Sequence, residues 1–150
     1  HVLLPIKFTN YQRGQSYGIE TALNWSATEN LKLGLTYSTL RMSLVATGPI
    51  REGIGRVDPE QQAGAKIFWT INNSWTLDSQ VTYVDELPGM AVDDYTRLDI
   101  NLGGRLTENL RVNLIAQNLL EKRHREFGEP LDLNTAEIER SIFAKLTWIL

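Results

Sequence analysis

The chain has 150 residues, 42% of them hydrophobic and 22% charged, which is enough for one folded domain with a sizeable core. Its net charge of −3 gives no case for nucleic-acid binding, and the absence of cysteine excludes disulfides, thiolate catalysis and thiolate-bound zinc. No apolar run approaches the roughly eighteen residues of a transmembrane helix, although membrane-spanning strands would escape such a search because their apolar and polar residues alternate.

The first third of the chain predicts one weak strand followed by a clear hairpin. Residues 2–10 alternate poorly and contain Pro5, which cannot donate to a ladder, so this strand is not expected in a central position. Residues 11–15 are predicted to form a polar turn. Residues 17–26 and 31–39 then alternate cleanly across a short connection, which predicts an antiparallel hairpin.

Five more segments alternate in the rest of the chain: residues 63–71, 75–83, 97–106, 110–117 and 140–150. The connections between strands are short and long in turn, and the long ones are residues 47–60, 85–94 and 120–139. Tight turns therefore gather at one end and long loops at the other. The pattern predicts an all-β fold, an antiparallel up-and-down meander of about eight strands.

Charged residues occupy only one of the two alternating phases of these predicted strands. They are Glu20, Lys32, Lys66, Asp78, Arg97, Asp99, Arg105, Arg111 and Lys145. Either a membrane barrel with a polar lumen or a soluble barrel with an apolar interior gives this alternation. The phase alone does not distinguish them.

Large aromatic residues distinguish a membrane barrel from a soluble one, because they share the apolar phase and lie near strand ends. They are Tyr17, Trp25, Trp69, Trp75, Tyr83 and Trp148. Indole and phenol rings favour the boundary between hydrocarbon and headgroups, whereas a soluble core would gather them near mid-strand. The residues therefore predict part of a transmembrane β-barrel with two aromatic belts and lumen-facing charges.

Several segments carry a family resemblance: YGIETALNW (17–25), LKLGLTYSTL (31–40), TYVDELPG (82–89), YTRLDINLGGR (95–105), QNLLEKRHREFG (117–128) and ERSIFAKLTWIL (139–150). In this order and spacing the chain resembles the C-terminal part of TonB-dependent outer-membrane receptors. It departs from the family in ending on Leu150 rather than an aromatic residue. It also has Gln61 where many relatives have histidine in a Pro-x-His-Gln motif.

The resemblance implies that residues 1–150 form the last part of a barrel of roughly 22 strands, with the plug domain and earlier strands absent. The start at His1 rather than an initiator methionine also suggests processing, or a piece of a longer protein. The implied location is the outer membrane of a Gram-negative bacterium, in contact with its lipid. The implied function is uptake of a scarce small molecule such as a ferric siderophore, coupled to a TonB-type protein through the missing N-terminal part.

The long loops would face the ligand, and their candidate contact residues are Arg51, Arg56, Asp85, Glu86, His124 and Glu126. His124 with Glu126 and Glu129 has the chemistry of a metal site, but a structural turn paired with its own arginines is the favoured interpretation. The acidic residues at 85, 86, 93 and 94 lack a calcium-loop pattern and are expected to form a solvated rim. We therefore expect no metal and no cofactor.

The lumen-facing charges are expected to pair with one another or with the plug, and lining a substrate path is the alternative. Glu20 and Asp78 could be imagined as an acid and base, but nothing supplies a nucleophile or an oxyanion donor. The chain is therefore not expected to be an enzyme. Two rival functions stay open: a complete eight-stranded outer-membrane barrel with a structural or adhesive role, and a soluble lipocalin-like barrel that binds a ligand.

Overall fold

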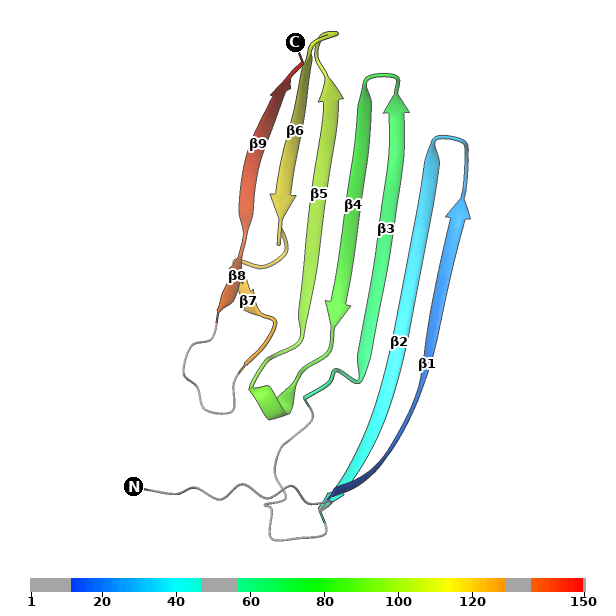
Figure 1. The fold of residues 1–150 in the computed structure, drawn as a ribbon, viewed down its shortest axis with the longest axis vertical. Coiled ribbons are helices and arrows are strands. Elements are labelled where there is room, and N and C mark those ends of the chain that lie inside the picture. The colour runs from blue at the N-terminus through cyan, green and yellow to red at the C-terminus, as the bar shows by residue number, and fades with distance from the viewer. Residues whose placement is uncertain (1–11, 47–56, 129–135, 150) are drawn as a thin grey trace, which may run out of the picture.

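The computed structural model describes residues 12–46, 57–128 and 136–149 and shows one antiparallel sheet of seven strands (Figure 1). Neighbours in the sheet follow the order β1-β2-β3-β4-β5-β6-β9. The strands are β1 (Gln12–Ser26), β2 (Leu31–Ala46), β3 (Gln61–Asn72), β4 (Trp75–Val84), β5 (Tyr95–Arg105), β6 (Leu110–Gln117) and β9 (Ser141–Trp148). The predicted all-β meander is confirmed, while the strand predicted at residues 2–10 lies outside the described residues.

The tight turns lie together at one end of the sheet and the long connections lie at the other, as predicted (Figure 1). Two long connections contain short elements that the sequence did not predict. A single 3-10 turn, η1 (Pro88–Met90), follows β4, and a small ladder of β7 (Arg123–Arg125) with β8 (Glu137–Glu139) lies between β6 and β9. The described part of the chain contains no helix long and apolar enough to cross a membrane.

The hairpin of β1 and β2 is longer than predicted at its open end. Gln12 pairs with Ala46 and every following residue of β1 has a partner in β2, down to Ser26 with Lys32. The polar turn predicted at residues 11–15 is therefore wrong from position 12 onward, because a continuous ladder satisfies the backbone there. Beyond the pair of Thr39 with Gln61, β2 has no further partner in β3, so the hairpin projects past the other strands (Figure 1).

Strand register places the two sequence phases on opposite faces of the sheet. Lys66 of β3 lies beside Gly34 of β2 and Gln80 of β4, and Gln80 lies beside Asp99 of β5. Residues directly opposite each other in a ladder point to the same face. Following these pairs puts all nine predicted lumen residues on one face and all six belt aromatics on the other.

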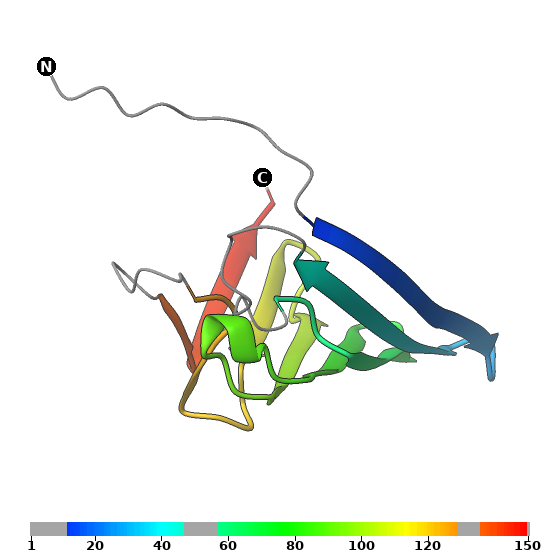
Figure 2. The same ribbon diagram turned by 90° about the horizontal axis from the view of Figure 1, so that it is seen from below.

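The sheet is curved into an open trough whose two edges are β1 and β9 (Figure 2). The charged face is the concave one, since a cavity on that face is lined by residues from β1 through β6. The apolar residues cover the convex face and stay exposed there: Ile19 is 64% exposed and Ile142 is 73% exposed. The sheet therefore has no dry core of its own within the described residues.

Buried side chains gather instead at the long-loop end. Leu87 and Val92 are buried and joined by an isolated bridge that closes the turn around η1. Asn118 and His124 are buried polar residues from the connection after β6. This small cluster positions the loops at the long-loop end of the sheet.

Candidate functional site

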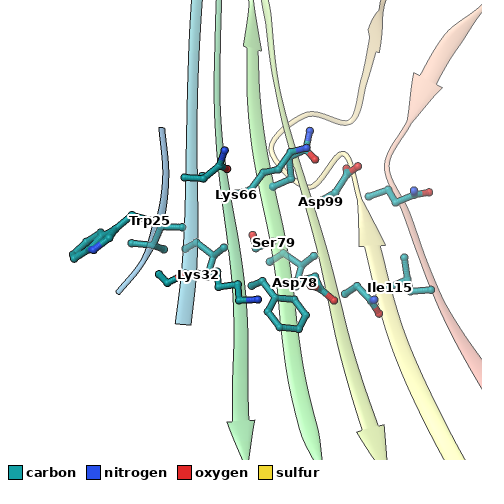
Figure 3. Close-up of a pocket in the computed structure, with 17 residues that line it drawn as sticks. Trp25, Lys32, Lys66, Asp78, Ser79, Asp99 and Ile115 are labelled. Atoms are coloured by element: carbon teal, nitrogen blue, oxygen red, sulfur yellow. The ribbon is translucent and has the colours of Figure 1, made fainter. Parts of the chain in front are cut away.

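The concave face carries a groove of about 540 Å³ between its charged side chains. Lys32 and Lys66 come from β2 and β3, and Asp78 and Asp99 come from β4 and β5, so the basic and acidic residues lie on neighbouring halves of the trough (Figure 3). In the same view the indole of Trp25 points away from them. The groove can therefore meet a polar ligand, or a polar protein segment, with cations on one side and carboxylates on the other.

Pairing within the groove is incomplete. Nη2 of Arg97 lies 2.9 Å from Oδ2 of Asp99, which is the one ion pair that joins two of the nine predicted lumen residues in the described part of the chain. Lys32, Lys66 and Asp78 have no ion-pair partner among the described residues. Mutual pairing thus accounts for two of the nine charges, and pairing with a plug stays a prediction.

Three large apolar residues on the concave face were not singled out by the sequence analysis. Phe68 lies opposite Asp78, and Ile115 of β6 lies opposite Phe143 of β9. Phe68 and Ile115 line the groove, so it offers apolar contact as well as charge. The signal was present in the sequence, because each of these residues breaks the otherwise polar phase of its strand.

A network of charged and polar groups closes the long-loop end of the trough. Nη1 of Arg97 lies 3.2 Å from Oε1 of Glu126, while its Nε donates to Asp99. Oδ1 of Asp99 also accepts a hydrogen bond from the backbone N–H of Asn118 at 3.0 Å. The side-chain Nδ2 of Asn118 donates to the carbonyl of Ile138 in β8 at 2.9 Å. The network therefore fastens the β7–β8 ladder to the end of β5.

His124 lies inside this arrangement rather than facing a ligand from the loop surface. Its side chain is 4% exposed, its ring stacks on Tyr95 with centroids 4.2 Å apart, and its Nε2 lies 3.2 Å from Oε1 of Glu126. The segment expected to be a structural turn instead begins with the strand β7, and Glu126 pairs with Arg97 of β5 and not with the arginines beside it. Those two, Arg123 and Arg125, pair with Glu137 across the ladder.

A second cavity, of about 580 Å³, lies between the turn after η1 and the β7–β8 ladder. It is lined by Ala91, Asp93, Asp94, Glu121, Arg123, His124, Arg125 and Glu137. Asp85 lies outside it and accepts a hydrogen bond from the backbone N–H of Glu86. Arg51, Arg56 and Glu129 lie outside the described residues. Among the residues that are described, no three His, Asp or Glu side chains form a group that could hold a metal.

The aromatic residues of the convex face are open to their surroundings. Trp25, Trp69 and Trp148 are 58%, 43% and 65% exposed, and Tyr17 is 70% exposed. Trp75 is half-buried against Gly104, its neighbour in β5. None of the four indoles is buried.

The chain matches no protein-family model. It also matches no curated protein.

Proposed function

We propose that this chain is a wall segment of a TonB-dependent receptor in the outer membrane of a Gram-negative bacterium. The observation that carries the proposal is the division of the sheet into two faces: a concave face with nine charges, and a convex face with aromatic residues near the strand ends whose two charges both lie at the extended end of the β1–β2 hairpin. A barrel wall in a bilayer requires this orientation, because hydrocarbon surrounds it and water fills it. A soluble barrel requires the reverse.

Strand lengths agree with a membrane-spanning role. A strand needs about 9–11 residues to cross a bilayer at the usual tilt. β3, β4 and β5 have 12, 10 and 11 residues, β1 and β2 exceed this span with 15 and 16 residues, and β6 and β9 are just short of it with 8 residues each. Because the extra length lies at the long-loop end, it extends the wall beyond the membrane on that side.

The open trough favours a wide barrel over a small closed one. The edges β1 and β9 do not pair with each other, and the described sheet has seven strands. Each edge strand presents unpaired backbone groups that a bilayer does not tolerate. In the proposed receptor, further strands continue the wall from these edges and a plug domain occupies the lumen.

The ligand is proposed to be a small scarce molecule, with a ferric siderophore as the expected class. This expectation comes from the resemblance. The polar groove and the loop-end cavity support it only in offering charged and apolar contacts to a polar guest. The partner that supplies energy is a TonB-type protein, and this chain performs no chemistry.

The membrane orientation is tested on the proposed full-length receptor, with any tryptophans outside this chain replaced by phenylalanine, by quenching of tryptophan fluorescence in vesicles of brominated phosphatidylcholine. We expect strong quenching, because Trp25, Trp69 and Trp148 lie on the face proposed to contact lipid. Replacing those three with phenylalanine should leave weak quenching from Trp75. Aqueous iodide serves as the control and should quench the wild-type chain weakly. Strong iodide quenching with no effect of brominated lipid would contradict the proposal.

The transport role is tested in the bacterium that carries the gene. Inactivating the gene is expected to abolish growth on one ferric siderophore as sole iron source, while growth on free iron salts stays normal. Loss of a TonB-type protein should give the same defect. Unchanged uptake over a panel of ferric siderophores would reject this ligand class and leave the membrane orientation standing.

A further inference from the structure

The extended end of the β1–β2 hairpin carries the two charges that the sheet places on its convex face. Eleven charged residues lie in the seven described strands of the sheet, and nine of them point into the trough. The other two are Arg13 and Arg41, and both belong to this one hairpin. Both arginines lie on a face that is otherwise uncharged. A charged side chain there requires a partner other than hydrocarbon.

Register fixes the place of both arginines relative to the aromatic belt. Arg41 lies directly opposite Tyr17, which is 70% exposed on the convex face. Arg13 lies four residues before Tyr17 in β1, on the same face, opposite Val45. Between the two rows lies the pair of Gln15 with Ser43. Going outward from the belt, the convex face thus changes from apolar to cationic and hydrogen-bonding.

The heights of these rows match the layers of a bilayer. From Trp25 to Tyr17 the strand spans about 27 Å, or roughly 21 Å of height at the usual tilt, close to the apolar band of such barrels. Arg13 lies about 10 Å of height further out, near the edge of a headgroup layer roughly 5–8 Å thick. Arginine side chains are long and bend toward the polar layer. Both guanidinium groups can therefore reach headgroup phosphates.

A shallow cavity lies on the convex face at the rows of Arg13 with Val45 and Gln15 with Ser43, next to the row of Tyr17 with Arg41. It has a volume of about 570 Å³ and is lined by Arg13, Gly14, Gln15, Ser43 and Val45. Neither arginine forms an ion pair with another described residue. The guanidinium fork suits bidentate binding of phosphate, and the amide and hydroxyl beside it add donors.

We infer that Arg13 and Arg41, with Tyr17, Gln15 and Ser43, bind the anionic phosphate headgroup of a membrane lipid at the long-loop end of the barrel. The inference rests on the proposed membrane orientation. The site ties the β1–β2 hairpin to the outer leaflet and so holds this part of the wall at a set height. It lies on the opposite face from the groove and does not contact the transported ligand.

The test uses the proposed full-length receptor that contains this chain, in phosphatidylcholine vesicles with a minority of phosphatidylglycerol. Spin-labelled forms of the two lipids report which one is immobilised at the protein surface. The wild-type chain is expected to prefer phosphatidylglycerol. Replacing both arginines (Arg13→Gln with Arg41→Gln) should lower the preference by at least about fivefold, the effect of one basic side chain at an anionic surface. Raising the salt concentration should weaken the wild-type preference as well.

Two controls separate charge position from net charge and from folding. Arg105→Gln with Arg111→Gln removes two cations from the concave face and should leave the preference intact. Arg13→Lys with Arg41→Lys keeps the charge and should retain most of it. If Arg13→Gln with Arg41→Gln keeps the wild-type preference for phosphatidylglycerol, the inference is overturned. If soluble glycerol phosphate abolishes the preference at the vesicle lipid concentration, the site binds free phosphate and the lipid assignment is wrong.

Failure of the membrane orientation would look different. In that case brominated lipid would not quench the indoles in wild type, and no lipid would be immobilised at all. Quenched indoles together with equal immobilisation of both lipids would reject only the headgroup site.

Discussion

Replacing Asn118 with leucine is expected to release the β7–β8 ladder from the end of the sheet. Asn118 is fully buried, adopts a left-handed φ of 53°, and donates its Nδ2 to the carbonyl of Ile138. Leucine tolerates this φ poorly, at a cost of about 1–2 kcal/mol, and leaves the part-buried carbonyl of Ile138 without its donor, at about 1–3 kcal/mol. The combined effect on ladder docking is about 2–5 kcal/mol, or roughly 30- to 4,000-fold.

Hydrogen exchange of the amides in β7, β8 and residue 140 measures this effect in detergent micelles. Amides of the β3–β4 pair serve as the internal reference and should keep their protection. Asn118→Gly is the matched variant, because glycine accepts the left-handed conformation and loses only the side-chain bond. The protection of the ladder amides in Asn118→Gly should lie between that in wild type and that in Asn118→Leu. Equal protection of the ladder in all three proteins would show that Asn118 does not hold it.

The same residue explains part of the sequence pattern at positions 117–128. Asn118 follows β6 directly and turns the chain with a positive φ, and Leu119 then donates its N–H to the carbonyl of Leu98. Further along, His124 stacks on Tyr95 and Glu126 reaches Arg97. The motif is therefore a folding unit that attaches a long loop to β5.

Strands, their order and their two faces were predictable because alternation repeats over seven segments and needs no long-range information. Trp25 and Lys32, for example, were assigned to opposite faces from parity alone, and the register agrees. The hairpins were predictable for the same reason, because the turn residues that mark them are also local in sequence. These features are local in sequence, so a single chain suffices to predict them.

The contacts of the loop end were not predictable, because they join residues far apart in the chain. Arg97 and Glu126 are 29 positions apart, and nothing local to either one specifies the other. The extension of β1 through Arg13 was missed for a different reason. Its composition is typical of a polar turn, and only pairing with β2 makes it a strand. The two convex arginines became visible once that pairing was known.

An arginine in place of Leu35 is expected to prevent stable residence of the chain in a bilayer. Leu35 lies midway along the alternating part of β2, on the convex face, and is 52% exposed. A lipid-facing arginine near the bilayer midplane costs about 2–4 kcal/mol, because its charge must leave water or distort the membrane. The free energy of unfolding of the proposed full-length receptor in phosphatidylcholine vesicles should fall by this amount, measured by urea titration with circular dichroism.

Thr36→Arg is the matched control, one position along the same strand. Thr36 points into the trough between Ala22 and Gly64, two small residues that leave room for a longer side chain. The added charge then meets the aqueous lumen, and its effect should stay within about 0.5 kcal/mol, as for an ordinary surface substitution. Both variants add the same charge. The difference between their free energies of unfolding therefore reports which face of the sheet contacts lipid. In a soluble protein Leu35→Arg would not be the less stable of the two variants, because an exposed arginine at that position would improve solubility at little cost in stability. Equal stability of the two variants in vesicles would therefore reject the lipid-facing assignment of the convex face.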